Sequence, residues 1–265
     1  MVDVLVILDG ASEAPGTAGP TLELARTPAL DALAAAGDCS WKAVLPPGVP
    51  VGSETAIAAL LGWVPDGPVD RGAVEAAARG IVVPPGKRAW RVDVGVRPHR
   101  HKLVAVSDEE PWIAADVPVR VWPPGAIPPQ ILDATTVVIG AVGAATGLAS
   151  LMGARVVIPE GATGRPDSDL GAKLVAARDA IERGAQRVVV HVGGPDEAAH
   201  ERDREAKIAA IEAADRELIG QLHEIVASVG GRLRVSPDHG CDPQTGMHVA
   251  GPVPVVSWSR VTVPR

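Results

Sequence analysis

Three aspartates, three histidines and one serine of the sequence stand where an apolar segment ends or a helical segment begins. They are Asp9, Ser53, Asp196, His200, Asp238, His239 and His248. Ligands of open α/β sheets bind at the carboxyl ends of the parallel strands. If the strands that precede these residues are parallel, the seven side chains converge on one edge of the sheet, and their types are those of metal ligands and of an activated nucleophile.

Carboxylate and imidazole ligands together suit Zn²⁺, Mn²⁺ and related divalent ions, and this number of ligands is sufficient for two ions. Two metal ions about 3.5–4 Å apart can hold the attacking and leaving oxygens of an in-line displacement. A serine hydroxyl is a poor nucleophile at neutral pH, and coordination to a metal is one way to activate it. The helix predicted behind Ser53 would add positive potential for a phosphoryl group.

Each of these residues also has a simpler interpretation when it is taken alone. An aspartate at the end of a strand is often a turn residue, Ser53 could simply be a helix N-cap, and a single histidine is usually structural. Asp196 and His200, four residues apart, could stabilise a helix by a few tenths of a kcal/mol. We favour a two-metal site because it explains all seven residues together.

The elements that must position these residues alternate along the chain. Valine-rich runs predict strands at 4–10, 135–140, 154–159, 187–192, 232–237 and 253–258. Helical spacing predicts helices at 27–37, at 54–62 with Ser53 as N-cap, at 167–183 and at 203–229. Buried strands that alternate with helices indicate an α/β fold with a mainly parallel, doubly wound sheet flanked by helices.

The middle of the chain has a different character. Residues 64–130 are dense in proline and show little helical periodicity outside 73–79. We interpret this range as a small inserted cap, with the core formed by residues 1–63 and 131–265. A long irregular excursion from the core is the alternative.

Composition excludes several classes of function. The chain has 265 residues, of which 46% are hydrophobic, enough for a sizeable core. Its net charge of −7 gives no overall attraction to nucleic acid or anionic lipid. Phe and Tyr are absent, so tryptophan and histidine are the only aromatic side chains on which nucleic-acid bases could stack. Cys39 and Cys241 could form at most one disulfide. The start "MVDVLVILDG" is typical of a core strand and not of a signal peptide or membrane span. We expect a cytoplasmic enzyme that binds neither nucleic acid nor membranes; composition does not predict its oligomeric state.

Several motifs, in order over most of the chain outside 80–130, carry a resemblance to a known family. They are "ILDG" (7–10), "RTPALDALAAAG" (26–37), "PVGSETAIAALLGW" (50–63), "DRGAVEA" (70–76), "IPEGATGRPDSDLGAK" (158–173), "VHVGGPDEAAHERDREAKIAAIEAAD" (190–215), "PDHGCDP" (237–243) and "HVAGPVPVV" (248–256). With them the chain resembles the alkaline phosphatase superfamily and, within it, the archaeal type of cofactor-independent phosphoglycerate mutase.

The resemblance implies a fold, two metal ions and a nucleophile. One ion would be held by Asp9, Ser53, Asp238 and His239, and a second by Asp196, His200 and His248. Ser53 would be the nucleophile that becomes transiently phosphorylated. The metals implied are Mn²⁺ or Zn²⁺, with Mg²⁺ or Co²⁺ also possible, and the core would carry an inserted cap that closes over the substrate.

The chain departs from the family pattern around the substrate. Family members are substantially longer, and their arginine-rich motif is replaced here by "RVDVGVRPHRHK" (91–102). The basic residues that could bind an anionic substrate are Arg71, Arg91, Arg97, Arg100 and Lys102, although a cluster of this kind can also be a solvated basic face. Glu54 and Ile57 occupy places where the family usually has aspartate and histidine. Gly193 occupies a place where the family commonly has lysine.

Three functional hypotheses follow from this combination. The first is an isomerase-type phosphoryl transfer, in the manner of a phosphoglycerate mutase, between hydroxyls of 3-phosphoglycerate or a similar small phosphorylated acid. The second is a metal-dependent phosphatase or phosphoesterase, or a phosphonate-processing enzyme of specialised metabolism. The third is a non-catalytic, metal-binding remnant with a binding or regulatory role, since a fold does not fix a function.

Overall fold

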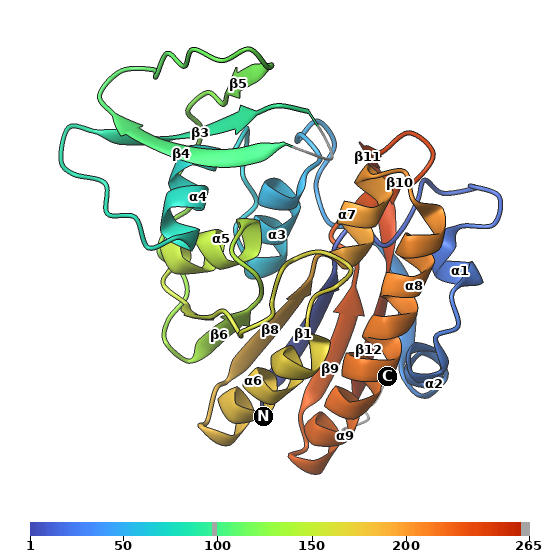
Figure 1. Cartoon of the computed structure of the whole chain (residues 1–265). Helices are drawn as coiled ribbons and strands as arrows, with labels where there is room; N and C mark the ends of the chain where they lie inside the picture. Colours follow the sequence, from blue (N-terminus) through green and yellow to red (C-terminus); the bar gives the residue numbers. More distant parts are fainter. Residues whose placement is uncertain (97–99, 261–265) are drawn as a thin grey trace.

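A seven-stranded sheet forms the centre of the protein, whose computed structural model describes residues 1–96 and 100–260 (Figure 1). The strand order is β2-β12-β9-β1-β8-β6-β7. Strand β12 runs antiparallel to both of its neighbours, and the other strand pairs of this sheet are parallel. The strands are β1 (Asp3–Leu8), β2 (Asp38–Ala43), β6 (Thr136–Ile139), β7 (Arg155–Val157), β8 (Arg187–Val192), β9 (Arg232–Ser236) and β12 (Pro252–Ser259). The prediction of a mainly parallel α/β sheet is confirmed.

Helices cover both faces of this sheet, as the alternation within β1 requires. Val4, Val6 and Leu8 belong to one apolar cluster, with residues of α6, α8 and α9, whereas Leu5 and Ile7 belong to another, with residues of α3 and α5. The helices are α1 (Thr21–Leu24), α2 (Pro28–Ala36), α3 (Ser53–Leu61), α4 (Arg71–Ala78), α5 (Ala144–Met152), α6 (Leu170–Glu182), α7 (Gly194–His200), α8 (Arg204–Ala214), the π-helical η1 (Asp215–Ile219) and α9 (Gly220–Ser228). None of the helices in the described ranges is both long and apolar enough to span a membrane.

The register of the central strands places the predicted ligands at one edge. Leu8, the last residue of β1, pairs with Val192, the last residue of β8. Ile7 pairs with Ser236 at the end of β9. The segments that follow β1, β8 and β9 therefore leave the sheet side by side, which is the arrangement expected from parallel strands.

A second, smaller sheet lies beyond α4 and is drawn in green at the upper left of Figure 1. It contains β3 (Arg88–Val94), β4 (His101–Ser107) and β5 (Val119–Val121), in the antiparallel order β4-β3-β5. Helix α4 contacts both β3 of this sheet and α5 of the main domain. The division into a core and a cap at 64–130 stays a prediction. A further hairpin of β10 (Gly240–Asp242) and β11 (Met247–Val249) follows β9.

The structure differs from the sequence-based expectation in several elements. The helix predicted over 203–229 is divided by the π-helical turn η1 between α8 and α9. Strand β2 and helix α5 were absent from the prediction. Strand β2 is mostly exposed and therefore lacks an apolar pattern, and α5, "AATGLASLM", is built largely from small residues.

Candidate metal centre

The first group of predicted ligands meets around the side chain of His239. Asp9 follows β1, Asp238 and His239 follow β9, and Ser53 is the first residue of α3. Nε2 of His239 lies 3.3 Å from Oγ of Ser53, 3.5 Å from Oδ1 of Asp9 and 3.4 Å from Oδ2 of Asp238. The four side chains therefore present one nitrogen and three oxygens to a common space.

The backbone before α3 leaves the Ser53 hydroxyl free of any capping role. The N-cap is Gly52, whose carbonyl oxygen accepts from the backbone N–H groups of Thr55 and Ala56. The prediction of Ser53 as N-cap is thus wrong by one residue, because the extended Gly52 ends the loop. The hydroxyl lies 3.5 Å from Oδ1 of Asp9 instead of bonding to the helix backbone.

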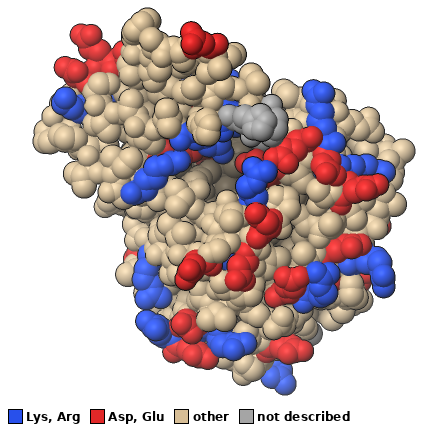
Figure 2. All heavy atoms as spheres, in the orientation of Figure 1, with Lys and Arg blue, Asp and Glu red and all other residues tan. Residues whose placement is uncertain are grey.

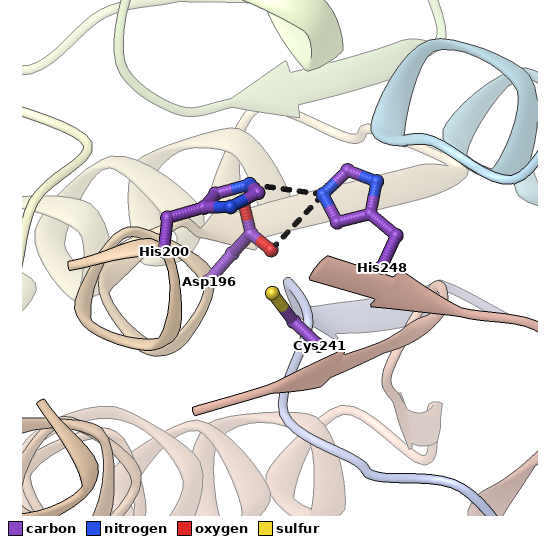
Figure 3. A group of neighbouring side chains, drawn as sticks. All are labelled: Asp196, His200, Cys241 and His248. Atoms are coloured by element: carbon purple, nitrogen blue, oxygen red, sulfur yellow. Dashed lines mark hydrogen bonds and ion pairs between the residues drawn. The ribbon is translucent and has the colours of Figure 1, made fainter. Parts of the chain in front are cut away.

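The second group consists of Asp196, His200 and His248 (Figure 3). Asp196 and His200 lie one turn apart on α7, and His248 lies on β11. Nε2 of His200 is 3.1 Å from Oδ2 of Asp196, and Nε2 of His248 is 3.4 Å from Oδ1 of the same carboxylate. The two Nε2 atoms are 3.0 Å apart. Nδ1 of His200 lies 2.8 Å from the carbonyl oxygen of Gly246, so in the neutral ring Nδ1 carries the proton and the Nε2 lone pair faces His248.

Two buried carboxylate oxygens show that these residues fit a cation. Among the described residues, Oδ1 of Asp196 and Oδ2 of Asp238 have no hydrogen-bond donor although both are buried. An unsatisfied buried acceptor is costly, and a metal ion between the ligands would satisfy it. Gly10 makes room between the two groups: its N–H donates to Oδ1 of Asp238 at 3.1 Å, and a Cβ on it would lie 2.5 Å from Oδ1 of Asp196.

The charges of the two groups also point to a cation. Burial raises the pKa of Asp9 well above its usual value, and the neighbouring charges of Asp238 and Asp196 raise it further. Burial acts in the same direction on Asp196, but the adjacent His200 and His248 side chains bring the pKa of that carboxyl well below its usual range. Three carboxylates thus share a small buried volume, and their mutual repulsion is what a divalent ion would offset.

His191, the penultimate residue of β8, contacts one of the predicted ligands. Its Nε2 lies 3.0 Å from Oδ2 of Asp9. Burial lowers the pKa of His191 to about 4, so the ring is neutral at ordinary pH and donates from Nε2. The backbone oxygen of His191 accepts a hydrogen bond of 2.9 Å from Nζ of Lys173. A contact of this kind orients a ligating carboxylate from behind.

A cleft of about 1330 Å³ opens above both ligand groups. Arg71, Arg91, Arg100 and Lys102 line it, together with Ser53 at its floor. Figure 2 shows a hollow with lysine and arginine side chains beside it. Arg97, the remaining basic residue of the predicted set, lies outside the described residues.

Most of the predicted basic residues are paired with carboxylates. Arg71 lies 2.9 Å from Oε2 of Glu54, and Lys102 lies 3.8 Å from Oε1 of Glu197. Arg91 is only 5% exposed and contacts Glu54 at 3.3 Å. Its charge is matched further by Glu75 and Asp93, so its side chain is fixed within a buried network. A contact of these basic residues with substrate stays a prediction.

Trp122 adds an aromatic surface to the same side of the cleft. The guanidinium carbon of Arg71 lies 3.9 Å from the centre of a ring of Trp122, and that of Arg120 lies 3.6 Å from it. The indole N–H donates to Asp93 at 2.9 Å. Arg120 was not among the predicted residues, because a short strand in a proline-rich region carries no motif.

Both cysteines are free, so the disulfide that their number allowed is not formed. Cys39 is exposed on β2. Cys241 is buried on β10, and its sulfur lies within 4.8 Å of ligand atoms of the second group.

Comparison with known proteins places the chain in a family. The family model described as the Metalloenzyme superfamily matches residues 1–263. The chain belongs to this superfamily. The predicted relationship to alkaline-phosphatase-like metalloenzymes is thereby confirmed.

The relatives carry the name of one activity. A 2,3-bisphosphoglycerate-independent phosphoglycerate mutase of Archaeoglobus fulgidus is 26% identical over 96% of this chain and 88% of its own length. Enzymes of the same name from Methanopyrus kandleri and Methanothermobacter thermautotrophicus are 35% and 39% identical, over 43% and 44% of this chain. The matches span only 26% and 29% of those two relatives.

Solved structures support the fold. A protein from Pyrococcus horikoshii superimposes with a TM-score of 0.80, at 24% identity, over 97% of this chain and 85% of its own. A cofactor-independent phosphoglycerate mutase from Thermoplasma acidophilum superimposes with a TM-score of 0.59, at 15% identity, over 99% of this chain and 91% of its own. At these identities the likeness establishes the architecture alone.

Proposed function

We propose that this protein transfers phosphoryl groups through a phosphorylated Ser53, with two divalent metal ions bound at the paired ligand groups. The observation that supports this most is the position of the Ser53 hydroxyl. It lies 3.3 Å from Nε2 of His239 and 3.5 Å from Oδ1 of Asp9, at the N-terminus of α3 and at the floor of the cleft. In this proposal Asp9, Ser53, Asp238 and His239 hold one ion, and Asp196, His200 and His248 hold the other.

The reaction has two balanced steps. Oγ of Ser53 attacks the phosphorus of the substrate, an Oγ–P bond forms, and the bond from phosphorus to the leaving oxygen breaks. The serine proton goes to solvent and the leaving oxygen takes up a proton. In the second step a hydroxyl oxygen of the bound acid attacks the phosphorus of the phosphoserine, a new O–P bond forms and the Oγ–P bond breaks. The attacking hydroxyl releases its proton to solvent, and Oγ of Ser53 takes one up. The bound metals would supply a lowered pKa for the serine hydroxyl and positive charge at the transferring group.

The chain's own residues orient and stabilise the transferring group. The N-terminus of α3 directs backbone N–H groups and the positive end of the helix dipole toward it. Arg71 stands beside this end of α3, since a Cβ on Gly52 would lie 3.5 Å from its guanidinium. We assign Arg71 to the phosphoryl oxygens, with Glu54 fixing its side chain by the ion pair at 2.9 Å.

The substrate that we propose is 3-phosphoglycerate, converted to 2-phosphoglycerate, or a similar small phosphorylated acid. The names of the relatives and the cations on the cleft wall support it. The ions are Mn²⁺ or Zn²⁺ in this proposal, with Mg²⁺ or Co²⁺ as alternatives, because carboxylate and imidazole ligands accept all of them.

The large volume of the cleft favours a second candidate function, in which water or another acceptor takes the phosphoryl group. Its 1330 Å³ exceeds the roughly 300–1,000 Å³ of most small-molecule sites, and a mutase must exclude water while its intermediate reorients. A phosphatase, a phosphoesterase or an enzyme of phosphonate metabolism would use the same Ser53 chemistry with a larger substrate.

Phosphorus NMR on metal-loaded protein distinguishes these candidates. With 3-phosphoglycerate, the mutase proposal predicts a signal of 2-phosphoglycerate without free phosphate. Release of free phosphate without formation of 2-phosphoglycerate would contradict the mutase proposal and support the hydrolytic candidate. Ser53→Ala should abolish either reaction while the Asp196 group still binds metal, and unchanged turnover in this variant would remove Ser53 from its assigned role.

A further inference from the structure

The second ligand group has a neighbour that the proposed function does not use. The ligand atoms of Asp196, His200, Cys241 and His248 all lie within 4.8 Å of one another. Figure 3 shows the sulfur of Cys241 pointing toward the carboxylate of Asp196. A cysteine in such a position completes a set of one oxygen, two nitrogens and one sulfur.

These four residues form two pairs, one on the β10–β11 hairpin and one on α7, whose side chains face each other. Cys241 and His248 are direct cross-strand partners in the β10–β11 hairpin, so their side chains leave the same face. Asp196 and His200 are four residues apart on α7 and also share a face. Helix α7 packs against β10, which brings the two pairs together.

The backbone of Cys241 is held on both sides. Its N–H donates to the carbonyl oxygen of Ser12 at 2.9 Å. Its own carbonyl oxygen accepts from Nζ of Lys207 at 2.7 Å, and Lys207 is fully buried and paired with Glu13 at 2.6 Å. The backbone of Cys241 is therefore held by two other segments of the chain, residues 12–13 and helix α8.

An independent observation marks the space next to the thiol as a cation site. Oδ1 of Asp196, on a residue only 6% exposed, has no hydrogen-bond donor among the described residues. The Nε2 atoms of His200 and His248 face each other across 3.0 Å. Two ring nitrogens and a carboxylate oxygen in this arrangement fit a shared positive ion better than they fit one another.

We propose that Cys241 is a thiolate ligand of the ion at the second group, so that this site holds Zn²⁺ in preference to Mn²⁺ or Mg²⁺. The inference rests on the proposed function for the presence of that ion and adds a ligand and a metal preference. Sulfur and imidazole ligands select Zn²⁺ or Co²⁺, whereas Mn²⁺ and Mg²⁺ prefer oxygen. On binding, the thiol releases its proton to solvent, and the thiolate with the Asp196 carboxylate balances the double positive charge.

The two sites would then differ in the metals that they prefer. The group around Asp9 offers three oxygens and one nitrogen, and that around Asp196 would offer one oxygen, two nitrogens and one sulfur. Zinc with four protein ligands can accept a fifth, so a substrate oxygen still has a place.

Cobalt spectroscopy on the full chain tests this ligand. In a Cys39→Ser variant Cys241 is the only cysteine left. When this variant is loaded with Co²⁺, a thiolate-to-cobalt charge-transfer band should appear in the near ultraviolet. The band should be lost in Cys39→Ser/Cys241→Ser and in Cys39→Ser/Cys241→Ala, with folding checked by circular dichroism. In these two double variants, chelator competition should show a Zn²⁺ affinity at this site more than about 10-fold weaker than in Cys39→Ser. Loss of a residue that only orients a metal ligand already weakens metal binding by about 10–100-fold.

The outcomes separate this inference from the proposed function. Two bound cobalt ions without the band in Cys39→Ser would overturn the Cys241 assignment, whether or not the Cys241 variants fold. The band together with absent phosphoryl transfer in the NMR assay would support the ligand and overturn the function. A chain that binds no Co²⁺, Zn²⁺ or Mn²⁺ would overturn both.

Discussion

At the scale of single residues, the proposed metal ligands depend on neighbours that hold them. Asp9 illustrates this, because its Oδ1 faces Ser53 and His239 while its Oδ2 lies 3.0 Å from His191. One oxygen is thus available to an ion and the other is held by a neutral ring. The geometry of the first group depends on a residue that is not itself a ligand in our assignment.

His191→Ala should therefore weaken metal binding at the group around Asp9 by about 10–100-fold, as loss of a partner behind a ligand usually does. Affinity at the group around Asp196 should change much less. Isothermal titration with Zn²⁺ or Mn²⁺ measures both sites. His223→Ala, on α9 and outside the cleft lining, is the matched control and should leave both affinities unchanged. Equal loss at both sites would point to general unfolding instead.

Gly193 is a second residue whose identity the structure explains. A Cβ on it would lie 2.5 Å from the carbonyl oxygen of Gly164. Gly193→Ala should lower the free energy of unfolding by about 1–3 kcal/mol, since the loop at Gly164 must move. Gly67→Ala is the control, because a Cβ there has nothing within 4 Å. Urea unfolding measures both, and equal effects would contradict the steric explanation.

Sequence could predict the residues placed by local secondary structure, but not those placed by packing between distant segments. The places of Asp9, Asp196 and Asp238 follow from strand ends, because parallel strands bring their carboxyl ends together. His191 and Cys241 became relevant only through packing. His191 faces Asp9 from the adjacent strand, and Cys241 meets α7 through the fold of a hairpin. Contacts between such distant segments leave no local pattern.

At the scale of elements, buried apolar strands were predictable and exposed or interrupted ones were not. Strand β1 has an uninterrupted buried run, whereas β2 is almost entirely exposed and is held by its pairing with β12. The turn η1 inserts an irregularity into a helix whose sequence reads as continuous. Its Asp215 accepts from the backbone N–H groups of Ala29 and Leu30, so tertiary contacts decide that geometry.

Helix α6 and strand β8 are joined by a buried amine that makes stability depend on pH. Burial lowers the pKa of Lys173 to about 8 from 10.5. Between these values the unfolded chain binds more protons than the folded one, so the folded state gains stability as pH rises. Below about pH 8 the full cost of burying the charged amine is present. Relative to Lys173→Met, the native chain should gain roughly 3 kcal/mol between pH 8 and 10.5. Urea unfolding at several pH values measures this gain. A difference in the free energy of unfolding between the native chain and Lys173→Met that does not change with pH would contradict the lowered pKa of Lys173.

At the scale of the whole molecule, the candidate site is assembled from segments that are distant in sequence. Its ligands come from the ends of β1 and β9, from α3 and α7 and from β11, and the cleft above them is lined by residues of β3, β4 and β5. Lys102 of β4 and Glu197 of α7 lie 3.8 Å apart, which joins the small sheet to the ligand-bearing helix. Ions at the centre would therefore connect five elements that are distant in sequence.

Removing those ions should lower the stability of the whole chain. Without them, burial and the charges of Asp238 and Asp196 raise the pKa of Asp9, which is the signature of carboxylates that repel one another. A ligand that binds only the folded state stabilises it by about 2.7 kcal/mol at 100 times its dissociation constant. Addition of Zn²⁺ or Mn²⁺ to chelator-treated protein should therefore raise the melting temperature in calorimetry. Asp238→Asn should reduce that rise, because the variant lacks a charged ligand of the first group, while Lys42→Gln, on the exposed β2, should leave it unchanged. A melting temperature insensitive to metal in the native chain would contradict the two-ion centre, because its ligands span five separate elements.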